Sequence, residues 1–235
     1  MSAPRRVVVL RHGRTAWNDE GRIQGQLDVP LDDVGLAQAA AVAEVLAEAR
    51  PYALVSSDLS RARQTAEPLA ARAGVQLITD PRLREISLGA WEGMTSDEAS
   101  ASYPVEHEAW RAGEDVRRGG GETYAEAGQR GAACVVESLT AVPAGQTLVA
   151  VTHGGTARGT LGVLLGLSVA DWWLLAPLGN TCWSVLAEGQ RGWRLERHNA
   201  GLGPLVGDAT GAHDLGSRPV GGSSSSPDVE PRQSL

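Results

Sequence analysis

The sequence predicts an α/β protein, a three-layer α/β/α sandwich around a mostly parallel central sheet. Short apolar stretches alternate with helix-like segments over residues 5–79, in the order strand, helix, strand, helix, strand. The strands are apolar on both faces, which is typical of parallel strands that helices cover on two sides. Right-handed crossovers then distribute the helices over both faces of the sheet.

Each element of this first part has a signal of its own. The strands are residues 5–10 (RRVVVL), 52–57 (YALVSS) and 75–79 (VQLIT). Residues 31–50 form a helix with an apolar stripe, capped by the side chain of Asp32. Residues 59–74 form the next helix, which ends at Gly74, and Pro68 inside it is expected to kink or break it.

The alternation resumes after a less regular stretch. Residues 82–121 carry short helical pieces, and a glycine-rich turn leads into a helix over residues 123–139. A strand over residues 147–152 ends at His153, and an apolar helix follows immediately. Two segments separated by a turn look like a closing hairpin, residues 182–188 and 192–198.

Residues 1–203 are expected to form one domain, and residues 204–235 a disordered tail. The tail is rich in Gly, Ser and Pro and has almost no apolar periodicity. Such a segment cannot bury enough apolar surface to offset the entropy lost on ordering.

Composition narrows the class of protein. The net charge of −7 gives no basic face for nucleic acid, and no apolar run reaches the roughly 18 residues that span a bilayer. We therefore expect no nucleic-acid or membrane partner, and a cytoplasmic location, since there is no secretory signal and only two cysteines are present. All 21 basic residues are arginine, which excludes a Schiff-base lysine and a lysine-containing phosphate loop.

Polar residues gather where the predicted strands end. Arg11, His12 and Gly13 follow the first strand, residues 56–63 (SSDLSRAR) follow the second, and His153 follows the fourth. In an open α/β sheet, ligands bind at the carboxyl ends of the strands. Histidines, arginines and a glutamate at one edge suit a phosphate monoester, because guanidinium groups hold its oxygens, imidazole attacks phosphorus and a carboxyl group moves the proton.

Taken singly, these residues have ordinary structural explanations. His12 could cap a strand end, and His153 could be a buried, hydrogen-bonded side chain. Arg61 and Glu85 could lie on the solvated surface. The hypothesis of a site depends on their coincidence at successive strand ends.

Four motifs, RHGRTAWNDEGRIQGQ, SSDLSRARQTA, LREISLGAWEG and VTHGG, occur in the order found in the histidine phosphatase superfamily, and the chain closely resembles that superfamily over residues 7–199. The resemblance implies a phosphoglycerate mutase-like fold and no metal or other cofactor. It implies that His12 becomes phosphohistidine and that Glu85 donates the proton to the leaving group. The groups it implies around the phosphoryl oxygens are Arg11, Arg61, His153, Asn18, Gln24 and the amide of Gly154.

The superfamily contains both phosphatases and cofactor-dependent phosphoglycerate mutases, so the reaction needs a further argument. The segment between Glu85 and His153 is short and its charged residues are more often acidic than basic, whereas mutases of this type carry a longer segment with extra basic residues. We therefore expect hydrolysis of small phosphorylated metabolites. The resemblance to phosphatases of this superfamily makes glucosyl-3-phosphoglycerate a candidate substrate. The alternatives are a cofactor-dependent mutase and a non-catalytic protein that binds phosphorylated ligands, and a homodimer is left open.

Two details concern residues outside these motifs. Residues 90–121 are expected to cover the pocket, where His107, Trp110 and Arg111 either touch substrate or simply pack on a surface helix. Trp172 and Trp173 either pack internally or form a dimer contact, and we expect internal packing, as is usual for large apolar side chains.

Overall fold

Strands β1 (Arg6–Arg11) and β4 (Thr147–Thr152) lie side by side in a six-stranded sheet of order β3-β2-β4-β1-β5-β6. The computed structural model describes residues 3–202. β1, β2, β3 and β4 are parallel, and β5 and β6 add an antiparallel hairpin next to β1. The remaining strands are β2 (Ala53–Ser56), β3 (Leu77–Thr79), β5 (Trp183–Gly189) and β6 (Gly192–Ala200).

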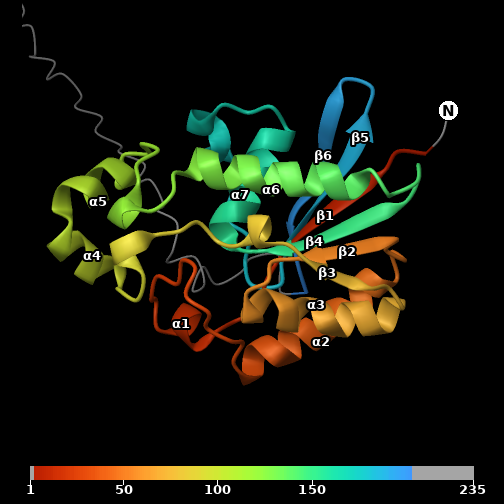
Figure 1. Cartoon of the computed structure of the whole chain (residues 1–235), viewed down its shortest axis with the longest axis horizontal. Helices are drawn as coiled ribbons and strands as arrows, with labels where there is room; N and C mark the ends of the chain where they lie inside the picture. The colour runs from red at the N-terminus through yellow and green to blue at the C-terminus, as the bar shows by residue number, and fades with distance from the viewer. Residues whose placement is uncertain (1–2, 203–235) are drawn as a thin grey trace, which may run out of the picture.

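Helices cover both faces of this sheet (Figure 1). α2 and α3 pack on one face and α6 and α7 on the other, while α1, α4 and α5 lie beyond the carboxyl ends of the strands. The helices are α1 (Ala16–Asp19), α2 (Asp33–Ala47), α3 (Ser60–Ala73), α4 (Ser96–Ser102), α5 (Pro104–Arg111), α6 (Tyr124–Leu139) and α7 (Gly154–Leu164). The predicted three-layer fold with a mostly parallel sheet is confirmed.

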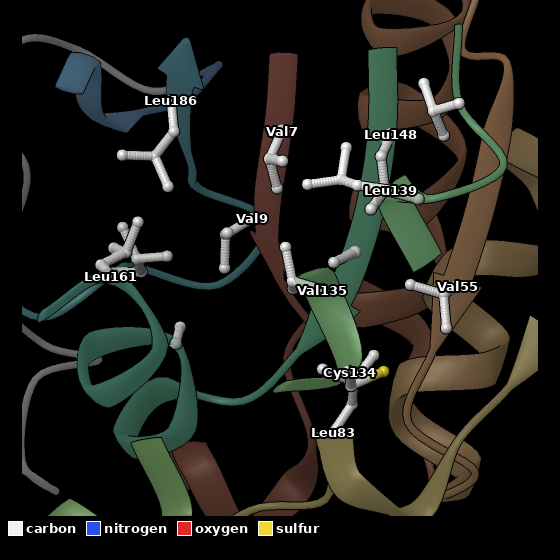
Figure 2. Close-up of a cluster of buried hydrophobic side chains, with 14 of the residues drawn as sticks. Val7, Val9, Val55, Leu83, Cys134, Val135, Leu139, Leu148, Leu161 and Leu186 are labelled. Carbon is white, nitrogen blue, oxygen red and sulfur yellow. The ribbon is translucent and has the colours of Figure 1, made fainter. Parts of the chain in front are cut away.

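The core is divided by the sheet into two layers. Val7 and Val9 of β1 point towards α6 and α7, where Figure 2 shows them among Val135, Leu139 and Leu161. The alternate β1 residues, Val8 and Leu10, pack with α2 and α3 instead. Burial of each such side chain contributes about 1.5–3 kcal/mol. A strand that is buried on both faces is thereby held rigidly, and so is the residue at its end.

A third apolar cluster lies beyond the sheet. It joins Trp91, Trp110 and Tyr124 to Trp172. His107 is buried in it, 5.6 Å from the Trp91 ring, and its Nε2 is 3.2 Å from Ser96 Oγ. His107 and Trp110 are therefore packed inside this cluster, and the predicted internal packing of Trp172 is found.

Pro68 does not interrupt its helix. α3 runs without a break from Ser60 to Ala73, and Gly74 caps it in the left-handed conformation with φ of 67°. The proline removes one backbone hydrogen bond. Ala62, Ala66 and Leu69, all buried against the sheet, offset this loss and keep the helix in place.

Two further predictions concern the C-terminal tail and membrane-spanning helices. The tail predicted for residues 204–235 lies outside the described residues, so the division into domain and tail stays a prediction. Within residues 3–202, no helix is both long enough and apolar enough to cross a membrane.

Candidate active site

The carboxyl ends of β1, β2 and β4 bring the predicted residues to one edge of the sheet. Arg11 pairs with Thr152 across β1 and β4, and Ser56 pairs with Val151 across β2 and β4. The next residues continue these ladders, since the His12 amide donates to the Thr152 carbonyl at 3.0 Å. The imidazole rings of His12 and His153 consequently lie 5.1 Å apart, centroid to centroid.

His12 is held in one tautomer. Its ring is almost completely buried, and its Nδ1 lies 2.7 Å from the Gly13 carbonyl oxygen. Because a carbonyl only accepts hydrogen bonds, Nδ1 carries the proton and Nε2 keeps its lone pair. Thr65 Oγ1 accepts from the Gly13 amide at 2.9 Å and so anchors the same peptide. His12 therefore presents Nε2 as a nucleophile without further rearrangement.

Position 13 accepts no side chain. A Cβ there would lie 2.7 Å from the carbonyl oxygen of Gly35, at the start of α2. Contacts that short do not occur between packed atoms, so the backbone would have to shift. The glycine in the RHG triplet is needed for this close approach of two backbone segments.

His153 is held in the opposite tautomer by Arg61. Arg61 Nε donates to His153 Nδ1 at 3.1 Å, so this ring carries its proton on Nε2, which lies 2.9 Å from Ser57 Oγ. Arg61 also donates to the carbonyls of Gly25 and Leu27, each at 2.8 Å. The guanidinium thus ties α3 to the loop that follows α1.

The pKa values of both imidazoles lie well below the usual 6.5. Burial is the largest cause for each, and the positive charges of Arg61 and Arg11 act in the same direction. His153 also feels the charges of His12 and Arg130. Both rings are consequently neutral at pH 7, and the site is positive through its arginines.

This neutrality makes stability depend on pH. The unfolded chain takes up protons on these histidines below its pKa of about 6.5, whereas the folded chain does not, so stability falls as the pH drops. We expect each group to account for about 1 kcal/mol of the loss between pH 6 and pH 5. Urea unfolding of the wild type and of His153→Gln at both pH values measures this. An equal pH dependence in the two proteins would show that His153 is not held neutral.

Arg11 is the second buried cation of the cluster. It is the last residue of β1, and its Nη1 donates to the Leu178 carbonyl at 2.7 Å. With Arg61, it places two guanidinium groups beside two neutral imidazoles in a water-poor site. Planar guanidinium groups match the oxygens of a phosphoryl group, and a dianion there gains more than it would in water.

Glu85 reaches the same place from the segment that follows β3. Its carboxylate accepts hydrogen bonds from the amides of Gly155 and Thr156 in the first turn of α7, at 3.1 and 2.9 Å, and from its neighbour Ile86 at 2.9 Å. The Thr156 hydroxyl is a fourth donor, at 3.2 Å. A Cβ at Gly155 would lie 2.7 Å from Ile86 Cδ1 and 3.0 Å from Glu85 Oε1, so this approach also requires glycine.

Arg130 of α6 holds the backbone around Glu85. Its Nη1 donates to the carbonyls of Arg82 and Arg84, and its Nη2 donates to the carbonyl of Glu85. Its Nε and Nη2 also pair with the two carboxylate oxygens of Glu122, at 2.8 Å each. Glu122 in turn accepts from the Ser87 amide at 2.9 Å. All five guanidinium N–H groups of Arg130 are therefore used to hold the segment on both sides of Glu85.

The remaining predicted residues surround this cluster with fewer contacts. Asn18 belongs to α1, and its Oδ1 accepts from Asn180 Nδ2 at 3.2 Å, while the same Asn180 nitrogen lies 3.1 Å from the His12 carbonyl. Gln24 is buried, and its Oε1 has no hydrogen-bond partner within residues 3–202. Gly154 starts α7 directly after His153, so its amide lies at a helix N-terminus, where anions bind well.

Several residues of the site were not predicted. Thr65, Asn180, Arg130 and Glu122 act through backbone groups far away in sequence, and nothing in the local pattern indicates such contacts. Arg63, two positions after Arg61, lies on the surface, 4.0 Å from Glu67. Over the described part of the chain, no three His, Cys, Asp or Glu side chains form a group that could hold a metal ion.

Comparisons with known proteins find phosphatases and a phosphoglycerate mutase that are similar to this chain. A glucosyl-3-phosphoglycerate phosphatase of Mycolicibacterium vanbaalenii is 42% identical over 215 residues, covering 83% of this chain and 95% of that protein. A solved mycobacterial glucosyl-3-phosphoglycerate phosphatase in complex with VO3 superposes with a TM-score of 0.78 at 40% identity, covering 83% of this chain and 99% of that one. A probable phosphoglycerate mutase of Yersinia pestis is 39% identical over 166 residues, which cover 68% of this chain and 75% of that protein.

The family comparison covers the whole predicted catalytic region. The model of the histidine phosphatase superfamily, branch 1, matches residues 7–201. The resemblance predicted from the four motifs is thereby confirmed, together with the phosphoglycerate mutase-like fold. The chain belongs to the histidine phosphatase superfamily.

Proposed function

We propose that this protein is a phosphatase that hydrolyses small phosphate monoesters through a phosphohistidine formed on His12. The observation that carries the proposal is the tautomer of His12, whose free Nε2 lone pair lies among Arg11, Arg61 and His153. A neutral nucleophile surrounded by buried cations suits attack on a dianionic phosphoryl group.

In the first step, Nε2 of His12 attacks phosphorus while the bond to the ester oxygen breaks. Glu85 donates a proton to that oxygen, and an alcohol leaves. Arg11, Arg61, the amide of Gly154 and the Nε2–H group of His153 hold the phosphoryl oxygens. The contacts of Glu85 with α7 support this role, because they hold its carboxyl group in one orientation.

In the second step, Glu85 accepts a proton from a water molecule, whose oxygen attacks the phosphohistidine. The bond from phosphorus to Nε2 breaks, and inorganic phosphate and the free imidazole are restored. Asn18 is linked through Asn180 to the His12 carbonyl, and Gln24 precedes Gly25, whose carbonyl accepts from Arg61. We propose that the side chains of Asn18 and Gln24 contact the phosphoryl oxygens.

Glucosyl-3-phosphoglycerate is the proposed substrate. The relatives named for hydrolysis of this ester cover 83% of the chain, whereas the relative named as a mutase covers 68%. The segment over α4 and α5 agrees with hydrolysis, because acidic residues outnumber basic ones there and a bisphosphate intermediate needs the reverse.

A panel of phosphate esters ranked by kcat/KM tests this proposal. It contains glucosyl-3-phosphoglycerate, 3-phosphoglycerate, glucose 6-phosphate and p-nitrophenyl phosphate, each with and without EDTA. We expect turnover that EDTA does not reduce, with the glucosylated ester ranked first. Efficient isomerisation of 3-phosphoglycerate that depends on 2,3-bisphosphoglycerate would reject hydrolysis, and no turnover of any ester would favour a binding protein.

The contacts of Arg130 lead to a prediction about proton transfer. Arg130→Lys keeps the charge but loses the planar fork that holds Glu122 and three backbone carbonyls. If these contacts place the Glu85 carboxyl, esters with poor leaving groups should slow about tenfold more than p-nitrophenyl phosphate, since misplacement by about 1 Å is costly. Arg82→Lys is the matched control, because Arg82 forms ion pairs nearby with Asp80 and Glu137 on the surface. Equal slowing of all esters would assign Arg130 to folding alone.

A further inference from the structure

A small cleft lies away from the candidate active site, where the first turn of α6, the middle of α7 and the 3-10 turn Val169–Leu174 meet the loop after α5. The space in and above it is about 250 Å³ with the open solvent at its mouth included, so a ligand would lie partly outside the cleft and only a group of a few atoms would enter it. None of the candidate catalytic side chains lines it. The lining residues are Gly113, Glu114, Asp115, Tyr124, Arg158, Val169, Trp172 and Trp173.

Arg158 is the unusual residue of this cleft. It is only 4% exposed, and its Nε and Nη1 have no hydrogen-bond partner within residues 3–202. Its guanidinium lies 4.8 Å from the centre of the Trp173 ring. Burial lowers its pKa, and the one interaction that opposes this comes from Tyr124. A buried cation that lacks a counter-charge is costly, so such groups are normally paired.

A second buried cation lies on the other side of the same aromatic cluster. The Arg118 guanidinium is 4.7 Å from the Tyr124 ring and 5.3 Å from the Trp110 ring. Its Nε also has no hydrogen-bond partner among the residues that the structure describes. Arg118 and Arg158 thus both lie against aromatic rings of this cluster, and such contacts only partly replace the lost hydration of a buried guanidinium.

The acidic residues of the cleft restrict the charge of an anion that could enter. The Asp115 carboxylate is occupied by the amides of Tyr124 and Ala125 at the start of α6, at 2.6 and 3.1 Å. Glu114 is exposed at the mouth. Both would repel a phosphate or sulfate dianion more strongly than a singly charged group, so the cleft favours one negative charge.

We infer that this cleft is a binding site for a small monocarboxylate. Its carboxylate would accept two hydrogen bonds from the fork of Arg158, and its short apolar part would lie against Trp172 and Trp173. Arg158 lies one helical turn along α7 from Gly154, so the cleft adjoins the candidate active site without sharing its side chains.

Propionate is the probe for this site, and thermal unfolding of the full chain is the measurement. At about ten times its Kd, propionate should raise Tm by about 4 °C, and sulfate at equal ionic strength should raise it less. Arg158→Met should lose the propionate response without lowering Tm in its absence, since an unpaired buried charge has been removed. Arg158→Lys should bind more weakly, because it keeps the charge and loses the fork.

Two controls distinguish this site from the candidate active site. Arg111→Met removes a nearby exposed arginine and should keep the full response. His12→Ala should also keep it, whether or not the chain proves to be a phosphatase. If the response survives in Arg158→Met, or if the wild type shows none, the inference is overturned.

Two sources supply a carboxylate of this kind, a free metabolite and a phosphorylated substrate. Steady-state kinetics with 3-phosphoglycerate and glycerol 3-phosphate distinguish the two sources, because only the first carries a carboxylate. A rise in KM for 3-phosphoglycerate alone in Arg158→Met identifies the substrate as the source. Unchanged KM values for both esters, with the propionate response lost, identify a free ligand.

Discussion

His12→Ala is expected to lower kcat/KM for every phosphate ester by a factor on the order of 10⁴ or more, because the variant lacks the proposed nucleophile. In the structure the nucleophilic atom is Nε2, left unprotonated by the contact of Nδ1 with the Gly13 carbonyl. The rest of the phosphate site stays in place, so inorganic phosphate should still raise Tm of the variant. Stopped assays with p-nitrophenyl phosphate measure the loss of turnover.

A second measurement tests the covalent step directly. Brief incubation with a ³²P-labelled ester, followed by denaturation in alkali, should leave label on the wild type and none on His12→Ala, since phosphohistidine survives alkali. His198→Ala is the matched control, because His198 is hydrogen-bonded to Ser184 and the Ala176 carbonyl, away from the cluster. Label that persisted on His12→Ala would place the nucleophile elsewhere.

Glu85→Gln is expected to have the second largest effect, and the effect should depend on the leaving group. An amide cannot donate a proton to the departing oxygen, so alkyl phosphates should slow by about 10²–10⁴. p-Nitrophenolate needs little protonation to leave, and its ester should slow by less than about tenfold in the first step. A plot of log kcat/KM against the pKa of the leaving alcohol should therefore be steeper for the variant.

The substitution also disturbs local hydrogen bonding, which requires a control. Glu85 accepts from four donors, and a glutamine amide would place an N–H group against one of them, at a cost of about 1–3 kcal/mol in folding stability. Glu92→Gln imitates this disturbance, since Glu92 Oε1 accepts from the amides of Gln26 and Leu88. If Glu92→Gln steepens the plot equally, the effect of Glu85→Gln reports on backbone disorder and not on proton donation.

The sequence predicted the sheet and the place of the site because both depend on local patterns. A doubly buried strand such as β1 is readable from its run of apolar residues, and the polar group after it then lies at the sheet edge. The break expected at Pro68 is absent, because burial of α3 against the sheet outweighs the local tendency of proline to end a helix. A single sequence also could not show that His107 is packed against Trp91, since a histidine on a short helix is equally consistent with contact to a ligand.

The unpredicted residues all act across long distances in sequence. Arg130 contacts backbone carbonyls about 45 positions earlier. Every residue has such a carbonyl group, so the sequence does not indicate which ones Arg130 contacts. Arg61 and Arg63 differ only in helical phase, which places Arg61 under the sheet edge and Arg63 in solvent. Arg158 is the one charged residue in the apolar helix α7, which can be seen in the sequence. A binding role for it can be proposed only with the structure, which shows the cleft that it lines.

The position of β4 in the sheet determines when the candidate site forms during synthesis of the chain. β4 lies between β1 and β2, and His153 comes directly after it, so nothing resembling the finished site exists until this strand inserts between two that were made much earlier. Parallel pairing between such distant segments forms late in folding, because loop closure has to precede it. We therefore expect a nascent chain to show no phosphatase activity until His153 has left the ribosomal exit tunnel and β4 has docked.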